Sequence, residues 1–423
     1  MTEPTNQPPV PPAPGAGDEA LAEHLLRPQV RPLQPVPVQA QNQKDGSTAV
    51  LVGLRDPSML SNQMLVVPPP ALPLVQQFRG ERTVHEIAEQ FKAPPAAVID
   101  LVRKLDEHGL LWGPTFERLE DELKTRLRTA GHFPIGASLM AGKDREEAIR
   151  AISEWLEQAE DPELDEPAIG IVAPHLDYPR GWPVYAASYR CFDRAPKPDR
   201  VVILGTNHFG IGDGVVSTDL GFATPIGTVR ADAGVNERLR RSLGDRLFID
   251  HLDHLPEHSI QLHLPWIQRV FGDVPVVTAL VPDPLVAMIA DDGGRVSREE
   301  FTAALREALD AEGGRTYLVA SSDLSHVGRA FGEPVAVDDR RKVEVEKQDR
   351  ETMAKYLGGD AGEFLEHVRW TKNPTRWCSI GNMTAALEIA RPARVELVDY
   401  RQACDPQGNA MVTSCSMALL GRR

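Results

Sequence analysis

The chain has 423 residues, enough for two or three domains of ordinary size, and 42% of them are hydrophobic. Acidic residues outnumber basic residues by 61 to 46, and the formal charge of -15 argues against a nucleic-acid partner, because phosphates attract cationic surfaces. No apolar run is long enough to span a bilayer and the N-terminus lacks the pattern of a secretory signal, so we expect a cytoplasmic protein with no membrane contact.

The first 45 residues form a proline-rich segment, with ten prolines among the first forty positions. A segment with few large apolar side chains cannot bury enough surface to offset its ordering entropy. We therefore predict a disordered arm over residues 1–45.

Residues 46–117 have the pattern of a small helical module. Thr83 and Glu86 have the spacing of a capping box, and apolar residues recur at helical intervals after them. A second predicted helix ends at Gly109, and residues 110–112 are typical of a short strand. This order predicts a winged helix, and TVHEIAEQF with VIDLVRKLDEHGLLW resembles the PqqD-like peptide-recognition modules. Packing against the module's own chain or a partner protein is an alternative to peptide capture, whereas acidic residues on the second helix disfavour DNA binding.

Residues 118–165 are charged and favour helices, which indicates a helical connector. From residue 166 to 423 the pattern changes to apolar runs (IGIVA, VVILG, PVVTALV, TYLVAS, VELVDY) that alternate with helical segments near 257–271, 297–310 and 381–390. This alternation is typical of an α/β domain with a central sheet flanked by helices.

Polar residues follow three of these predicted strands. His175 comes directly after IGIVAP, His208 follows VVILG, and Asp323 with His326 follow YLVAS. Because the carboxyl ends of parallel strands converge at one edge of a sheet, we expect these side chains to share a crevice. Cys378 directly precedes a predicted helix, where a thiol ionises more easily and can bind metal or attack an electrophile.

The motifs APHLDYPRGWPVY, ILGTNHFG, EHSIQLHLPW, SSDLSHVG and CSIGNMTAAL occur in an order that resembles the Memo family, known in prokaryotes as AmmeMemoRadiSam system protein B. The resemblance covers about residues 166–423 and implies the mixed-sheet α/β fold of the class III extradiol dioxygenases. It further implies a metal site built from His175, His208 and Cys378. The chain departs from the family at CSIGN, where a glycine commonly follows the cysteine.

The same resemblance implies roles for the other pocket residues. His326 is expected to be a general acid or base, because an imidazole titrates near neutral pH, and Asp323 is expected to orient it or a ligand. The remaining residues are predicted to contact the substrate: Glu257, His258, His263 and Tyr178.

Two imidazoles and one anionic ligand leave open positions on a divalent metal. The fold analogy places Fe(II) first, and the thiolate also suits copper or zinc. We expect a metal-dependent oxidoreductase that acts on a small aromatic compound or a modified peptide, with a radical-SAM protein as a potential partner. The alternative is a module that binds a peptide, a phospho-ligand or a metal without turnover, and metal content together with O₂ uptake separates the two.

Overall fold

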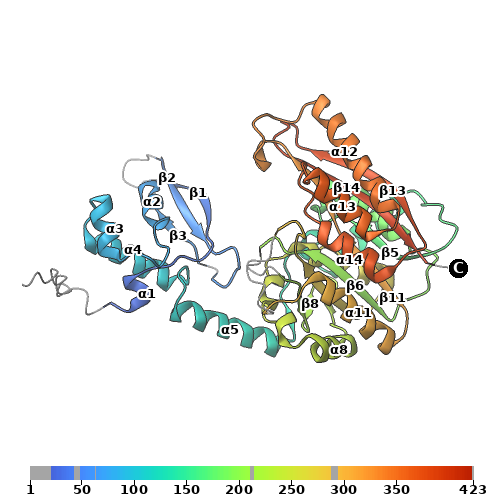
Figure 1. Cartoon of the computed structure of the whole chain (residues 1–423), viewed down its shortest axis with the longest axis horizontal. Helices are drawn as coiled ribbons and strands as arrows, with labels where there is room; N and C mark the ends of the chain where they lie inside the picture. Colours follow the sequence, from blue (N-terminus) through green and yellow to red (C-terminus); the bar gives the residue numbers. More distant parts are fainter. Residues whose placement is uncertain (1–20, 42–47, 62, 210–213, 287–293, 422–423) are drawn as a thin grey trace, which may run out of the picture. The chain divides into compact units, whose positions relative to one another are not determined.

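The computed structural model describes residues 21–41, 48–61, 63–209, 214–286 and 294–421. The chain divides into two compact units, residues 1–126 and residues 127–423 (Figure 1). None of the helices in these described ranges is long and apolar enough to cross a membrane.

The N-terminal unit combines a small sheet with a group of helices. Strands β1 (Gln34–Gln41), β2 (Thr48–Arg55) and β3 (Leu65–Val67) form an antiparallel sheet in that order. The helices are α1 (Glu23–Leu26), the 3₁₀ turn η2 (Pro69–Ala71), α2 (Leu72–Val75), α3 (Val84–Phe91), α4 (Pro95–Glu107) and the start of α5 (Pro114–Ala130).

The predicted details around α3 and α4 are confirmed. The Thr83 side chain accepts a hydrogen bond from the Glu86 amide, and the Glu86 carboxylate accepts one from the Thr83 amide, which completes the capping box. Gly109 has a φ of 68°, the left-handed conformation expected after a helix. Residues 110–112, however, make only an isolated bridge between Leu111 and Val30 rather than a regular strand.

The prediction of a disordered arm up to residue 45 is wrong for residues 21–41. Leu25, Leu26 and Leu33 pack against the core of the module that follows. Arg31 is buried and pairs with Asp56 at 3.3 Å. A few leucines are sufficient to order this segment because the later helices supply the rest of the core. Composition does not reveal such a long-range effect. The other residues of the predicted arm lie outside the described part.

The second unit is built on an eight-stranded mixed sheet in the order β12-β14-β5-β11-β6-β10-β7, with β13 paired to β14. Strands β5, β11, β6 and β10 are parallel to one another, and the remaining pairs are antiparallel. The strands are β5 (Ala168–Ala173), β6 (Arg200–Thr206), β7 (Val216–Thr218), β10 (Val276–Val281), β11 (Thr316–Ser321), β12 (Asp323–Val327), β13 (Arg394–Cys404) and β14 (Met411–Leu420). The predicted alternation and central sheet are confirmed.

Helices cover both faces of this sheet. On one side α7 (Tyr178–Arg190) contacts β5, β13 and β14. On the other side α14 (Ile380–Ala390), labelled in Figure 1, contacts β6 and β11. The other helices are α8 (Ala233–Leu243), α9 (His258–Gln261), α10 (Leu264–Phe271), α11 (Arg298–Glu312), α12 (Asp339–Leu357) and α13 (Ala361–Thr371). Short 3₁₀ turns complete the connections: η3 (Ala137–Ala141), η4 (Asp245–Leu247), η5 (His251–His254) and η6 (Arg329–Phe331).

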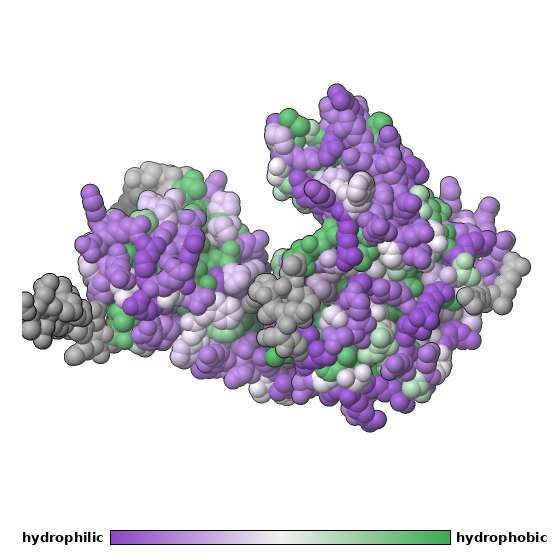
Figure 2. Space-filling model, viewed as in Figure 1, coloured by the Kyte–Doolittle hydropathy of each residue, from purple (hydrophilic) through white to green (hydrophobic). Residues whose placement is uncertain are grey.

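Most of the predicted connector belongs to the second unit. Strand β4 (His132–Phe133) pairs with β8 (Gly221–Ala223), which also pairs with β9 (Thr228–Val229). Helix α6 (Arg145–Gln158) packs on α7 and α10, and the Trp155 ring stacks on Trp266 at 5.7 Å between centroids. The visible surface of this unit is mostly hydrophilic, with apolar residues gathered in a hollow beneath the part that carries α12 and α13 (Figure 2).

Candidate metal centre

The edge at which the parallel strands end carries the predicted site. Strand β11 lies between β5 and β6, and all three run in the same direction. His175 follows β5 by two residues and His208 follows β6 by two residues. Their ring centroids lie 5.0 Å apart, so the strand ends bring them together as predicted.

Four potential metal-binding side chains meet at this edge. One ligand atom from each of His175, His208 and His258 lies within 4.8 Å of the others. The Cys378 Sγ atom lies 3.3 Å from His175 Nε2. Nitrogen and sulfur ligands that share one tetrahedral ion are separated by roughly 3.4 Å, because each lies about 2.0 to 2.3 Å from the metal. The donor set therefore fits a mononuclear site for a divalent or soft monovalent metal.

Hydrogen bonds from outside the cluster fix the ring orientations. His175 Nδ1 lies 3.2 Å from the Ser321 carbonyl oxygen, which leaves Nε2 directed at Cys378. The buried Glu257 carboxylate lies 3.1 Å from His208 Nδ1 and 3.3 Å from His258 Nδ1. Such outer partners select the tautomer of a ligand histidine and raise its basicity. Glu257 therefore supports two rings, whereas the sequence predicted that it contacts the substrate.

The charges of the cluster are strongly coupled. Burial alone would raise the pKa of Glu257, but its hydrogen bond to His208 and the charge of that ring outweigh burial and hold the pKa at about 2. Burial would likewise lower the pKa of His208, but hydrogen bonds with Cys378 and Glu257 raise it to about 10. Burial and the neighbouring imidazoles lower the pKa of His175, which favours the neutral, metal-binding form.

The two predicted catalytic residues lie beside this cluster. Asp323 is buried, accepts a hydrogen bond from the His175 amide at 3.2 Å, and has a pKa that burial raises to about 7. His326 Nδ1 faces the carbonyl oxygens of Leu324 and Arg376 at 3.0 and 3.1 Å. The ring is half-buried, and its Nε2 has no hydrogen-bond partner among the described residues.

Two other predicted residues are part of the core. Tyr178 is 1% exposed and its hydroxyl donates to the Leu262 carbonyl oxygen. His263 is fully buried and its Nδ1 lies 3.1 Å from the Tyr189 hydroxyl. Both side chains pack between α7 and α10, so this placement does not support the predicted contact with a substrate.

A buried carboxylate that the sequence did not reveal lies on α12. Asp349 has no exposed surface and accepts four hydrogen bonds, from Ser325 Oγ at 2.5 Å, Trp377 Nε1 at 2.8 Å, the Tyr400 hydroxyl at 2.8 Å and Thr413 Oγ1 at 2.6 Å. Two of these donors directly precede His326 and Cys378 in sequence. Asp349 therefore holds both segments in place.

Replacing Asp349 by asparagine should lower the free energy of unfolding by about 1–3 kcal/mol, because an amide cannot accept from all four donors. Urea unfolding followed by tryptophan fluorescence measures this change. Asp339→Asn is the matched control, since Asp339 lies on the same helix with a 98% exposed side chain and should change stability by no more than about 0.5 kcal/mol. Equal effects of the two substitutions would contradict this role of Asp349.

Two buried histidines predict how stability depends on pH. Burial lowers the pKa of His254 and of His263 to about 3, below the ordinary value of 6.5. Between pH 3 and pH 6.5 the unfolded chain therefore binds more protons than the native protein. Their contribution to stability is complete above pH 6.5 and is lost as the pH falls toward 3.

His254→Gln should remove one of the protons that the unfolded chain binds and the native protein does not. The slope of unfolding free energy against pH, measured by urea unfolding between pH 5 and 6, should then fall by about 1.4 kcal/mol per pH unit. His367→Gln, on α13, serves as the control and should leave the slope unchanged. An unaltered slope in His254→Gln would show that His254 already carries a proton in the native state.

Comparisons with known proteins match the second unit. The model of the Memo-like protein family matches residues 135–418, which include the whole cluster. A MEMO1 family protein of Pyrobaculum arsenaticum is 30% identical over 251 residues, or 58% of this chain and 81% of that protein. A MEMO1 family protein of Methanococcoides burtonii is 30% identical over 253 residues, or 59% and 85%. One of Thermotoga neapolitana is 32% identical over 247 residues, or 57% and 79%.

Proposed function

Because the chain belongs to the Memo-like family, and because its donor cluster fits a single ion, we propose that it is a metal-dependent oxidoreductase with a site related to that of the extradiol dioxygenases. The observation that carries this proposal is the approach of Cys378 Sγ to His175 Nε2 within the histidine cluster. In this proposal His175, His208 and Cys378 are the ligands. Iron(II) is the first candidate metal, and copper and zinc follow because thiolate is a soft ligand.

A bound metal would activate a substrate oxygen as a Lewis acid or exchange electrons with O₂. The chain's own residues supply orientation and proton transfer. Glu257 holds the His208 ring through Nδ1, and Ser321 holds the His175 ring in the same way. His326 Nε2 is open to accept a proton from a bound hydroxyl group and return it, since Nδ1 is anchored by two carbonyl oxygens.

One observation favours the second function, metal binding without turnover. His258 adds a fourth donor to the cluster. Structural metal sites are usually closed by four protein ligands, whereas catalytic sites keep one position for water or substrate. If His258 is a ligand, the site is closed and the protein stores or carries metal.

The experiment that separates these functions starts with the purified full-length protein loaded anaerobically with Fe(II). Near-stoichiometric iron and O₂ consumption upon addition of a catechol-type probe are expected for the oxidoreductase. Stoichiometric metal without O₂ consumption, together with loss of metal in His258→Ala, would assign the protein to metal binding. Protein that holds no metal would leave neither assignment standing.

The N-terminal unit bears on the proposed substrate and partner. A PqqD-like role for this unit would suit a peptide substrate and a radical-SAM partner. All four cysteines are free thiols, as expected in the reducing cytoplasm, where we place the protein. Crosslinking of the full chain to a radical-SAM protein that modifies peptides tests the partnership.

A further inference from the structure

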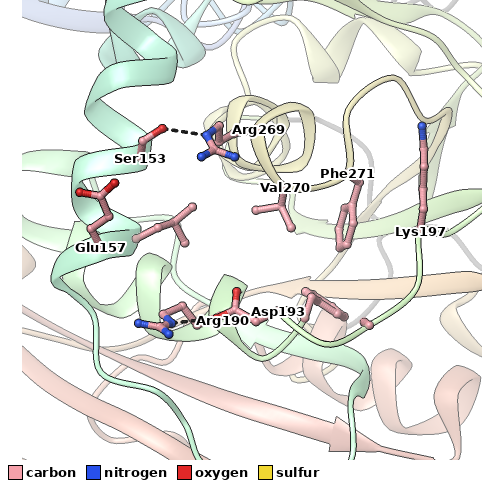
Figure 3. Close-up of a pocket in the computed structure, with 11 residues that line it drawn as sticks. Ser153, Glu157, Arg190, Asp193, Lys197, Arg269, Val270 and Phe271 are labelled. Carbon is pink, nitrogen blue, oxygen red and sulfur yellow. Dashed lines mark hydrogen bonds and ion pairs between the residues drawn. The ribbon is translucent and has the colours of Figure 1, made fainter.

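A cavity lies in the α/β unit on the side formed by α6, α7 and α10. It has a volume of about 650 Å³, within the range of small-molecule sites. Its polar margin comes from Arg190, Asp193, Arg269, Lys197 and Glu157 (Figure 3). None of these residues belongs to the donor cluster described above.

The guanidinium group of Arg269 is positioned but not neutralised. Its Nε atom donates to Ser153 Oγ at 2.7 Å, and Figure 3 shows the group held at the margin of the cavity by this bond. No carboxylate within the described residues forms an ion pair with Arg269. Its terminal nitrogens are therefore free to donate two parallel hydrogen bonds to a ligand carboxylate.

Glu157 supplies the opposite charge close by. It follows Ser153 by one turn of α6, so the two side chains lie on the same face of that helix. Its carboxylate has no ion-pair partner in the described ranges. The margin of the cavity thus carries an unpaired guanidinium group and an unpaired carboxylate that a ligand can contact.

The remaining charged groups of the cavity are one ion pair and one lysine. Arg190 Nε donates to Asp193 at 3.0 Å, so this pair is neutral. The Lys197 ammonium lies 3.9 Å from the position that a Cβ would take on Gly272, at the C-terminal end of α10, where the helix dipole favours a cation. Between the charged groups the wall is apolar, with Leu156, Val270 and Phe271.

We propose that this cavity binds a free α-amino acid with an apolar or aromatic side chain. Arg269 receives its carboxylate, Glu157 its ammonium group, and the apolar wall its side chain. A purely anionic ligand would leave Glu157 opposed by a like charge, and a purely cationic ligand would do the same to Arg269. Only a zwitterion satisfies both, because each charge-assisted hydrogen bond then has its complementary group.

The test uses three probes that differ by one charged group. Isothermal titration calorimetry of the full-length protein should detect saturable binding of L-phenylalanine. Hydrocinnamate, which lacks the ammonium group, and phenethylamine, which lacks the carboxylate, should each bind about tenfold more weakly or worse. Absence of L-phenylalanine binding at millimolar concentrations, or equal affinity for hydrocinnamate, would overturn the proposal.

Substitutions assign the contacts. Arg269→Gln and Glu157→Gln should each weaken L-phenylalanine binding by about tenfold or more, while metal content stays that of the wild type. Arg306→Gln and Glu307→Gln, which make the same charge changes on α11, are the controls and should leave binding unchanged. L-phenylalanine binding that survives both cavity substitutions would place the amino acid elsewhere and refute this assignment.

Discussion

Cys378→Ala protein should bind divalent metal at least about 100-fold more weakly than the wild type. Loss of an outer-shell partner alone costs about 10- to 100-fold in metal affinity, and a ligand contributes more than its outer-shell partners. Cys378 Sγ lies 3.3 Å from His175 Nε2, so the substitution removes a donor atom from the cluster itself. Competition with a chromogenic chelator measures the affinity.

The matched control is Cys404→Ala, because Cys404 is also a partly exposed free thiol but lies at the end of β13. It should retain the wild-type metal affinity. If Cys378→Ala and Cys404→Ala bind metal equally well, the three histidines alone hold the ion and the thiol is not a ligand.

His326→Ala should keep its metal and lose about 10²- to 10⁴-fold in turnover, the usual contribution of a positioned proton-transfer group. The reason lies in its geometry: Nδ1 is bound to two carbonyl oxygens, while Nε2 is open. Iron content by elemental analysis and O₂ uptake with a catechol-type probe give the two readouts separately.

The same substitution at His367 is the control, since this histidine lies on α13 outside the cluster. His367→Ala should change neither iron content nor O₂ uptake. A His326→Ala protein that loses iron as completely as Cys378→Ala would make His326 a ligand, and its role as acid or base would then be wrong.

The strand-end histidines could be predicted because they depend on a local pattern. An apolar run followed by a polar residue marks the carboxyl end of a buried parallel strand, and this rule places His175 and His208 correctly. The same rule places Asp323, which follows β11 by two residues and lies 3.7 Å from His175 Nε2, although it also opens the additional strand β12. The sequence predicted that His258 contacts the substrate. In the structure its ring lies 4.8 Å from that of His208, a proximity that residue spacing within a short helix does not reveal.

Other features depend on contacts between distant parts of the chain. Asp349 lies in the charged segment KVEVEKQDRETMAKYL, where an aspartate on a solvated helix face is the ordinary expectation. Its four donors come from four other segments, so only the folded chain reveals it. Residues 21–41 show the same limitation, because their leucines become core only when α3 and α4 are present.

The position of β14 in the sheet has a consequence for biosynthesis. This strand lies between β12 and β5, and Met417 pairs with Val172, more than two hundred positions earlier in the chain. The ribosome synthesises β5 long before β14. The edge of β5 that pairs with β14 therefore stays unpaired until nearly the whole domain has been translated. The two strand-end histidines also emerge long before the cysteine does. Metal capture is therefore expected only after release of the finished domain, and a nascent chain arrested before β14 should depend on chaperones to protect its unpaired strand.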